Sequence, residues 1–350
     1  MRQKLLLDYF YNKAFSENRP VSVMIELLTK CNLRCEHCYL PSHTNSGLSL
    51  QKIKALFLEL RELGVVNISL TGGEIFLRDD LFEIIEFARS LYMRVFLLSN
   101  GTLLNSERIA RLKTFHIAEF STTIFSMNPY IHDSITQKSG SLLLLLNNLR
   151  EIKEAGIPIR IKTPLMQKNL ENFVKIQAYC EENGFEYLVS PLIFSKNDGD
   201  SSPQMLRIKD CDLCSAMRII DSISRNDHLH ANNVPCAALF YSFAIDCQGD
   251  VYPCNSFFYK IGNIYHHSLK DIWYSSEELK LIKSIKNSDL KCCNKCKYST
   301  QCDRCPGMVF MENKDLYSCD HFAKKLAKIR FSNYNLSLKE INQGEKETEV

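Results

Sequence analysis

Three cysteines in the run CNLRCEHCY, with the spacing C-x3-C-x2-C, constrain this chain more than any other feature. They are Cys31, Cys35 and Cys38, and they follow an apolar, strand-like stretch. Cysteine thiolates hold iron–sulfur clusters, usually four to a [4Fe–4S] cube, and this run supplies three. One iron would then lack a protein ligand, and an open position on a metal is where a substrate binds. A zinc knuckle and buried, inert thiols are the alternatives, and His37 between two of the thiols keeps zinc chemically possible.

The composition is that of an ordinary globular protein, and the 350-residue chain is long enough for two domains. The net charge of +3 is too small to favour nucleic acid or an anionic membrane as a partner. The longest leucine run, Leu142–Leu146, is far shorter than the ~20 residues that a membrane span needs. Leu5–Leu7 is broken by Asp8, which argues against a cleaved signal peptide. We therefore expect a cytoplasmic protein.

Fifteen cysteines in a chain of this kind indicate bound metal, because cytosolic thiols are kept reduced and seldom form disulfides. Three of them lie at 31–38, Cys180 stands alone, and eleven fall between positions 211 and 319. This distribution predicts a second, metal-rich domain in the C-terminal half.

Apolar, β-branched runs alternate with helical patterns through the first half of the chain. Gly64, Gly156 and Gly184 follow three of the helical patterns, where a left-handed C-cap is expected. Six strand–helix units predict a parallel sheet with right-handed crossovers. The strands are expected at Val21–Leu28, Val65–Leu70, Val95–Leu98, Ala118–Ile124, Ile157–Ile161 and Glu186–Ile193, and four helices at Leu50–Leu63, Leu81–Leu91, Leu142–Ala155 and Leu170–Asn183.

The motif TGGE, Thr71–Glu74, ends the second expected strand. Gly72 and Gly73 allow the backbone to approach a ligand closely, and the Glu74 side chain can then face that ligand. In βα folds the chemistry lies at the carboxyl ends of the strands, where the cysteine triad and TGGE both fall. With Tyr39 after the third cysteine, these motifs resemble those of the radical S-adenosylmethionine (SAM) superfamily.

That resemblance implies an α/β fold, a partial (β/α)6 TIM-type barrel, in which the three cysteines hold a [4Fe–4S] cluster and SAM completes the fourth iron. Reduction would cleave SAM to methionine and a 5′-deoxyadenosyl radical that abstracts a hydrogen from the substrate. Lys138 and Lys162 could supply a cation to the SAM carboxylate, although a solvated lysine is the usual case. The implied SAM-binding residues are Gly72, Gly73, Glu74, Ser99, Asn100 and Ser121.

A second set of cysteines follows the polar stretch SKNDGDSSP. Cys254 closes the run AIDCQGDVYPC, and a later run has the spacing C-x2-C-x5-C-x2-C. This pattern resembles the SPASM extension of radical SAM enzymes, which carries two auxiliary [4Fe–4S] clusters. We therefore expect a barrel over residues 1–195, a linker over 196–235, a SPASM domain over 236–330 and a polar tail over 331–350.

The resemblance divides these cysteines between two auxiliary clusters. No clear cysteine completes the first cluster, so His230, Cys211 or Cys214 could fill the position, or it could be open to substrate. The last spacing is x2 where the family usually has x3. One cluster would use Cys236, Cys254 and Cys305, and the other Cys293, Cys296, Cys302 and Cys319.

Three further cysteines have other expected roles. Cys292 could replace Cys293 as a ligand, whereas Cys180 and Cys247 are expected to be small buried hydrophobes. A structural double-zinc site is the alternative for the whole C-terminal set, because zinc also favours C-x2-C pairs.

SPASM enzymes mostly modify peptides or proteins, so a polypeptide is the expected substrate. Anaerobic sulfatase maturases place a catalytic Asp directly after the Cys of the YPC run, and here that position is Asn255, which cannot accept a proton. We predict oxidative crosslinking of a ribosomally made peptide, through a thioether or a carbon–carbon bond, because auxiliary clusters can take up an electron. Peptide epimerisation and sulfatase-type maturation are the enzymatic alternatives, and an iron–sulfur electron-transfer or zinc-binding module is the non-enzymatic one.

The expected partners follow from this prediction. SAM cleavage requires a reductant such as flavodoxin or ferredoxin. About 20 residues precede the first expected strand, too few for a leader-binding domain, so a separate leader-binding protein is possible. Neither nucleic acid nor a membrane is expected.

Overall fold

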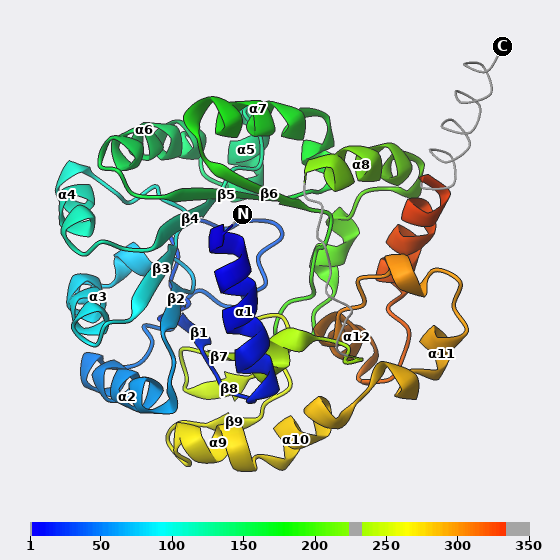
Figure 1. The fold of residues 1–350 in the computed structure, drawn as a ribbon. Helices are drawn as coiled ribbons and strands as arrows, with labels where there is room; N and C mark the ends of the chain where they lie inside the picture. The colour runs from blue at the N-terminus through cyan, green and yellow to red at the C-terminus, as the bar shows by residue number, and fades with distance from the viewer. Residues whose placement is uncertain (1, 224–232, 334–350) are drawn as a thin grey trace.

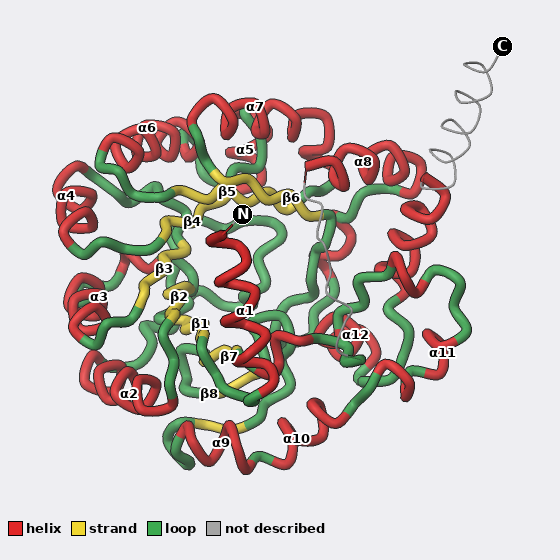
Figure 2. The backbone as a smooth tube through the Cα atoms, viewed as in Figure 1, coloured by secondary structure: helices red, strands yellow, loops and turns green. Residues whose placement is uncertain are grey.

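The computed structural model describes residues 2–223 and 233–333, and within them a nine-stranded sheet forms the frame of the molecule. The strand order is β6-β5-β4-β3-β2-β1-β7-β8-β9. The sheet curves into an open ring with helices outside it (Figure 1), and the yellow strands of Figure 2 trace that ring. The strands are β1 (Ser22–Glu26), β2 (Asn67–Thr71), β3 (Arg94–Leu98), β4 (Glu119–Thr123), β5 (Ile159–Pro164), β6 (Glu186–Ser190), β7 (Ser242–Ile245), β8 (Asp250–Tyr252) and β9 (Gly262–Asn263).

The alternation of strands and helices expected for the first half of the chain is confirmed. β1 to β6 pair in parallel in chain order, and their ends differ from the expected ones by up to three residues. Gly64, Gly156 and Gly184 have φ angles of 97°, 75° and 69°, as left-handed helix ends require. The expected helices correspond to α2 (Leu50–Leu63), α3 (Leu81–Ser90), α6 (Ser141–Glu154) and α7 (Phe173–Asn183).

The strands of the cysteine-rich half continue the barrel sheet. β7 pairs in parallel with β1, and β8 and β9 follow it antiparallel. The expected linker contains a helix, α8, that contacts β6, and the expected tail lies largely outside the described residues. The proposed domain boundaries therefore cut a continuous sheet. The remaining helices are α1 (Arg2–Ser16), α4 (Ser106–Thr114), α5 (Pro129–Thr136), α8 (Asp210–Ile223), α9 (Leu269–Ser275), α10 (Glu277–Ser284), α11 (Lys291–Asn294), α12 (Pro306–Asn313) and a helical stretch at 321–333.

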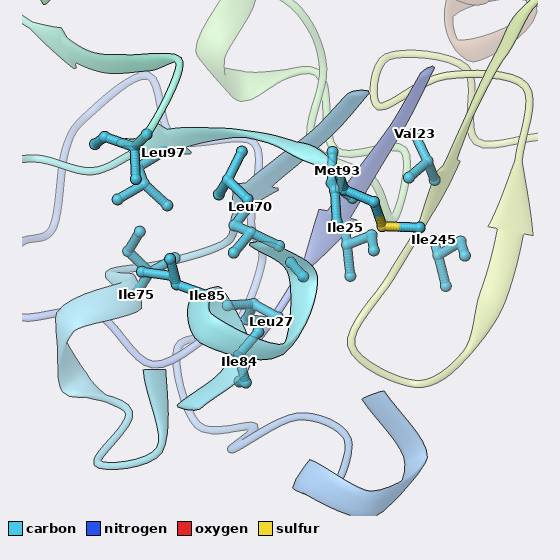
Figure 3. Packing of buried hydrophobic residues seen from close by; sticks show 14 of the residues in the cluster. Val23, Ile25, Leu27, Leu70, Ile75, Ile84, Ile85, Met93, Leu97 and Ile245 are labelled. Carbon is cyan, nitrogen blue, oxygen red and sulfur yellow. The ribbon is translucent and has the colours of Figure 1, made fainter. Parts of the chain in front are cut away.

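The main core lies between the sheet and its outer helices. Val23, Ile25 and Leu27 alternate along β1 and its continuation, with Val23 toward Ile245 of β7 and Leu27 toward Ile84 of α3 (Figure 3). Full burial of each such side chain contributes roughly 1.5–3 kcal/mol to folding. Because successive strand residues point to opposite faces, the intervening residues of β1 face the inside of the barrel.

The leucine run of α6 is amphipathic. Leu142 and Leu145 are buried against the barrel, whereas Leu143 and Leu144 are exposed, which agrees with a helix that packs on the sheet. In the part of the chain that the structure describes, no helix is both long enough and apolar enough to cross a membrane.

Helix α1 lies at the amino end of the barrel, inside the ring of strands as seen in Figure 1. Asn67 Nδ2, in the first residue of β2, donates to Tyr11 Oη at 3.3 Å. The rings of Phe15 and Phe240 are 4.6 Å apart between centroids. These contacts cover the amino ends of the strands, so the opposite, carboxyl end carries the open site.

Candidate functional site

A cavity of about 220 Å³ opens at the carboxyl ends of the barrel strands. The loop after β1 and the ends of β2 to β5 form its wall. Lys162 lies in this wall and Lys138 does not. The residues predicted from the sequence that line the cavity are Cys31, Cys35, Cys38, Gly72, Gly73, Ser99, Asn100 and Ser121.

The three cysteines of the triad lie together on the loop between β1 and α2. Burial, followed by the neighbouring charges of Cys38 and Cys31, raises the pKa of the Cys35 thiol to about 12. The Leu33 N–H donates to Cys31 Sγ at 3.4 Å, and His43 Nε2 lies 3.6 Å from Cys38 Sγ. The ligand form of cysteine is the thiolate, so metal binding would displace protons from these thiols.

The TGGE turn is joined directly to the loop that carries the triad. The Gly73 N–H donates to Leu28 O at 2.9 Å, and the Glu74 N–H donates to Lys30 O at 2.8 Å, one residue before the first cysteine. A Cβ atom on Gly73 would collide with the carbonyl oxygens of Lys30 and Thr29. Gly73 is thus needed because its backbone packs directly against the loop that carries the cysteine triad, called here the cluster loop. The sequence alone indicated only that its backbone could approach a ligand closely.

The Glu74 side chain does not line the cavity in this structure, and its contact with a ligand stays a prediction. The side chain is fully buried behind the cavity wall, and its carboxylate accepts hydrogen bonds from Ser99 Oγ at 2.8 Å, the Asn100 N–H at 2.8 Å and the Phe76 N–H at 3.0 Å. These bonds satisfy a buried carboxylate that would otherwise be costly. Glu74 therefore fixes the positions of Ser99 and Asn100, which do line the cavity.

Charged and polar groups continue along the barrel interior below the cavity. Ser121 Oγ donates to Glu119 Oε1 at 2.9 Å, and Glu119 pairs with Arg160 at 2.9 Å. Lys162, on the same face of β5 as Arg160, has its pKa lowered by burial. A cation in the cavity wall fits a ligand carboxylate, the role that the sequence left open for Lys138 or Lys162.

Three histidines line the cavity, His37, His43 and His132, and of these the sequence singled out only His37, as a possible zinc ligand. Burial lowers the pKa of His37 to about 4, so its ring is neutral near pH 7. Its Nδ1 atom is buried and has no hydrogen-bond partner among the described residues, while its ring packs on Phe125 at 5.0 Å. His43 lies at the rim beside Cys38. For His37 and His43, nearness to the triad in the sequence is the signal that could have marked them as ligand contacts.

Tyr39 connects the cluster loop to β1. Its hydroxyl donates to the carboxylate of Glu26, and its ring stacks on Phe258 at 6.3 Å. Burial is the main reason that the pKa of Glu26 rises to about 7, and Asp246 adds to the rise. The contact fixes the loop immediately after Cys38 to the end of the first strand.

A first group of C-terminal cysteines lies where η5 (Ala237–Phe240), β8 and α12 meet. Cys254 is half-buried, and loss of solvent contact, followed by the charges of Cys305 and Cys236, raises the pKa of its thiol to about 12. Cys236 and Cys305 stand at the starts of η5 and α12. The structure therefore brings together the three residues assigned to one auxiliary cluster.

A second group lies around α11. Burial and then Cys292 raise the pKa of Cys293 to about 11, and the two sulfur atoms are 3.8 Å apart. Cys292 is exposed and Cys293 is half-buried, so either could be a ligand. Cys319 lies within electrostatic range of the other three thiols assigned to this cluster, which are Cys293, Cys296 and Cys302.

The candidates for completing the first group lie on helix α8 or outside the described residues. Cys211 and Cys214 are exposed on α8, and His230 lies outside the described residues. Cys180 and Cys247 are buried, as expected. Within the described residues, no three His, Cys, Asp or Glu side chains are close enough together to hold a single metal ion.

Two family models match the chain. The radical SAM superfamily matches residues 25–180, and the SPASM iron–sulfur cluster-binding domain matches residues 236–306, so together they cover more than half of the chain. The chain belongs to the radical SAM superfamily and carries a SPASM domain. [4Fe–4S] clusters and SAM, as predicted, are its cofactors. These matches give no support to a non-enzymatic module.

Several known proteins are similar to this chain. The subtilosin biosynthesis protein AlbA of Bacillus subtilis is 26% identical over 82% of this chain and 67% of AlbA. An AdoMet-dependent heme synthase of Oleidesulfovibrio alaskensis is 24% identical over 81% of this chain and 82% of its own length. The crystal structure of Streptococcus suis SuiB with its precursor peptide SuiA has a TM-score of 0.68 at 16% identity, covering 89% of this chain and 78% of SuiB. That last similarity shows the fold alone.

Proposed function

We propose that this enzyme oxidatively crosslinks a ribosomally made peptide, through a thioether or a carbon–carbon bond. The observation that carries the proposal is the presence of two C-terminal cysteine groups in a chain that also has a SAM-type cavity, because a net oxidation needs an electron acceptor besides SAM. AlbA, a bacteriocin biosynthesis protein, and the sporulation killing factor maturation protein SkfB of Bacillus subtilis are relatives whose names support a peptide substrate.

In this proposal different residues bind SAM, the SAM-cleaving cluster and the two auxiliary clusters. The triad holds the cluster that, when bound and reduced, supplies the electron for SAM cleavage. Gly72 and Gly73 leave room for the SAM amino group, and Lys162 pairs with the SAM carboxylate. Glu74 orients Ser99 and Asn100 in the wall. The proposed auxiliary ligands are Cys236, Cys254 and Cys305 for one cluster and Cys293, Cys296, Cys302 and Cys319 for the other.

The proposed reaction removes two hydrogens from the peptide. One leaves as a hydrogen atom to the 5′-deoxyadenosyl radical, and the other leaves as a proton to solvent and an electron to an auxiliary cluster, as the new bond forms. Asn255 is exposed and cannot take the proton, which argues against sulfatase-type oxidation.

Mass spectrometry of the enzyme's own precursor peptide tests the proposal. After anaerobic reconstitution and addition of SAM and a reductant, we expect a loss of two hydrogens per crosslink, and no formylglycine from a sulfatase-type Cys or Ser peptide. The matched control is the enzyme with Cys31, Cys35 and Cys38 changed to Ala. A product of unchanged mass that gains one deuterium from solvent would establish epimerisation instead.

A tetrapyrrole substrate is the second candidate, and the observation that favours it is the match to AdoMet-dependent heme synthase over 81% of the chain. We expect an iron porphyrin, incubated under the same conditions, to keep its mass. A porphyrin product of altered mass would favour this second candidate over peptide crosslinking.

We further propose that a flavodoxin or ferredoxin reduces the enzyme, that a separate protein presents the leader peptide, and that the reaction takes place in the cytoplasm. The low potentials typical of protein [4Fe–4S] clusters support a reductant of that class.

A further inference from the structure

The positive charge of this protein is concentrated around the second cysteine group. Residues 286–330 contain ten Lys and Arg against five Asp and Glu, a net charge of +5, whereas the whole chain has +3. The rest of the chain is therefore slightly acidic. Within this segment the run KCCNKCK interleaves Lys291, Lys295 and Lys297 with three cysteines.

These three lysines, called here the lysine face, are exposed, and α11 lies at the edge of the molecule away from the barrel (Figure 1). Among the described residues no ion pair is recorded for any of them, and Lys297 Nζ lies 5.1 Å from the centroid of the Tyr298 ring. Lys324, on the adjoining helical stretch, is also exposed and lies within electrostatic range of Cys319.

The acidic residues of the same segment are occupied elsewhere. Asp303 pairs with Arg330, and Glu312 pairs with Arg207 at 2.8 Å. Asp320 is buried and accepts from the Cys305 and Ala323 N–H groups. Asp289 accepts from the Lys286 N–H and Asp315 accepts from Ser318 Oγ, so none of the five carboxylates forms an ion pair with the lysine face among the described residues. An uncompensated cationic surface attracts an anionic partner and speeds its association.

The cysteines beneath the lysine face are close to solvent. Cys292 is exposed, and Cys293 and Cys296 are half-buried. A cluster held by the second group would thus lie near the surface, as exchange of single electrons with another protein requires. The positive charge and the accessible thiols are independent observations that indicate the same kind of partner.

We propose that the lysine face is the docking surface for an acidic one-electron carrier protein, which exchanges electrons with the cluster on Cys293, Cys296, Cys302 and Cys319. One electron leaves the reduced cluster and enters the carrier's cofactor; an oxidised flavin becomes a semiquinone and takes up a proton from solvent. The inference rests on the proposed auxiliary cluster but not on the peptide reaction. The crosslinking experiment can therefore fail without affecting it.

Stopped-flow mixing tests the proposal. The dithionite-reduced, desalted enzyme is mixed with an oxidised acidic flavodoxin, and semiquinone formation is followed at several salt concentrations. We expect a second-order rate that falls with ionic strength, and a rate about 10-fold lower at low salt in the variant K291E/K295E/K297E, because the attraction becomes repulsion. The neutral variant K291Q/K295Q/K297Q should give an intermediate rate with a weaker salt dependence.

The matched control is K113E/K175E/K270E, which alters the net charge equally at exposed lysines of α4, α7 and α9. It should keep nearly the wild-type rate. Iron content and the electron paramagnetic resonance spectrum of each variant verify that the clusters are loaded. Equal rates in the two triple-Glu variants, a rate independent of salt, or a wild-type enzyme with no cluster on the second cysteine group would overturn the proposal.

Discussion

Changing Cys31, Cys35 and Cys38 together to Ala is expected to abolish 5′-deoxyadenosine formation. The structure places all three thiols in the cavity wall at the carboxyl end of the barrel, where they are the proposed ligands of the cluster that cleaves SAM. The wild-type enzyme should bind on the order of twelve irons as three four-iron clusters, and the variant should keep about two thirds of them. Chromatography of the reaction mixture measures 5′-deoxyadenosine, and iron analysis measures the number of irons bound by each protein.

The retained iron is the control for this experiment. A variant that loses all of its iron has lost its fold or its loading, so the comparison needs the auxiliary clusters intact. Undiminished SAM cleavage in such a variant would contradict the assignment of the triad. A zinc-replete, iron-free wild-type protein that remains folded would favour the structural-zinc alternative.

Gly73→Ala is expected to lower SAM cleavage by about 100-fold or more. The added methyl group would displace the carbonyls of Thr29 and Lys30, and with them the start of the loop that carries Cys31. A shift of about 1 Å at a reacting centre can cost 10²-fold in rate. The rate of 5′-deoxyadenosine formation, measured at matched iron content, tests this expectation.

Gly156→Ala is the matched control for that variant. Gly156 follows helix α6, where a Cβ atom meets no atom within 4 Å, and its left-handed φ of 75° is the only obstacle. We expect a loss of roughly 1–2 kcal/mol in stability with an unchanged rate. A Gly73→Ala enzyme with the control's rate would show that close backbone approach at the TGGE turn is not needed.

Local patterns in the sequence were sufficient for the barrel and its motifs. Apolar runs such as Val65–Leu70 and the glycines after the helices are short-range signals, and the strands and caps appear where those signals lie. The pairing of β7 with β1 could not be predicted in the same way. This pairing joins residues more than 200 positions apart. Ser242–Ile245 is too short an apolar run to indicate the strand with which it pairs.

The orientation of individual side chains was also beyond the sequence. A glutamate after two glycines could face the cavity or turn away from it, and Glu74 turns away because Ser99 and Asn100 from the next strand supply its donors. Likewise, the bond from Tyr39 to Glu26 depends on how the cluster loop folds back over β1. Contacts of this kind require the three-dimensional arrangement of three separate segments.

Transfer of a peptide hydrogen into 5′-deoxyadenosine is the most direct test of the central claim, that a SAM-derived radical in this cavity acts on a peptide. The precursor peptide is prepared with deuterium on the α and β carbons of the crosslinked residues. It is then incubated with SAM, reductant and the reconstituted enzyme. We predict 5′-deoxyadenosine that carries one deuterium, in proportion to the crosslinked peptide. Crosslinked peptide accompanied only by unlabelled 5′-deoxyadenosine would contradict the account.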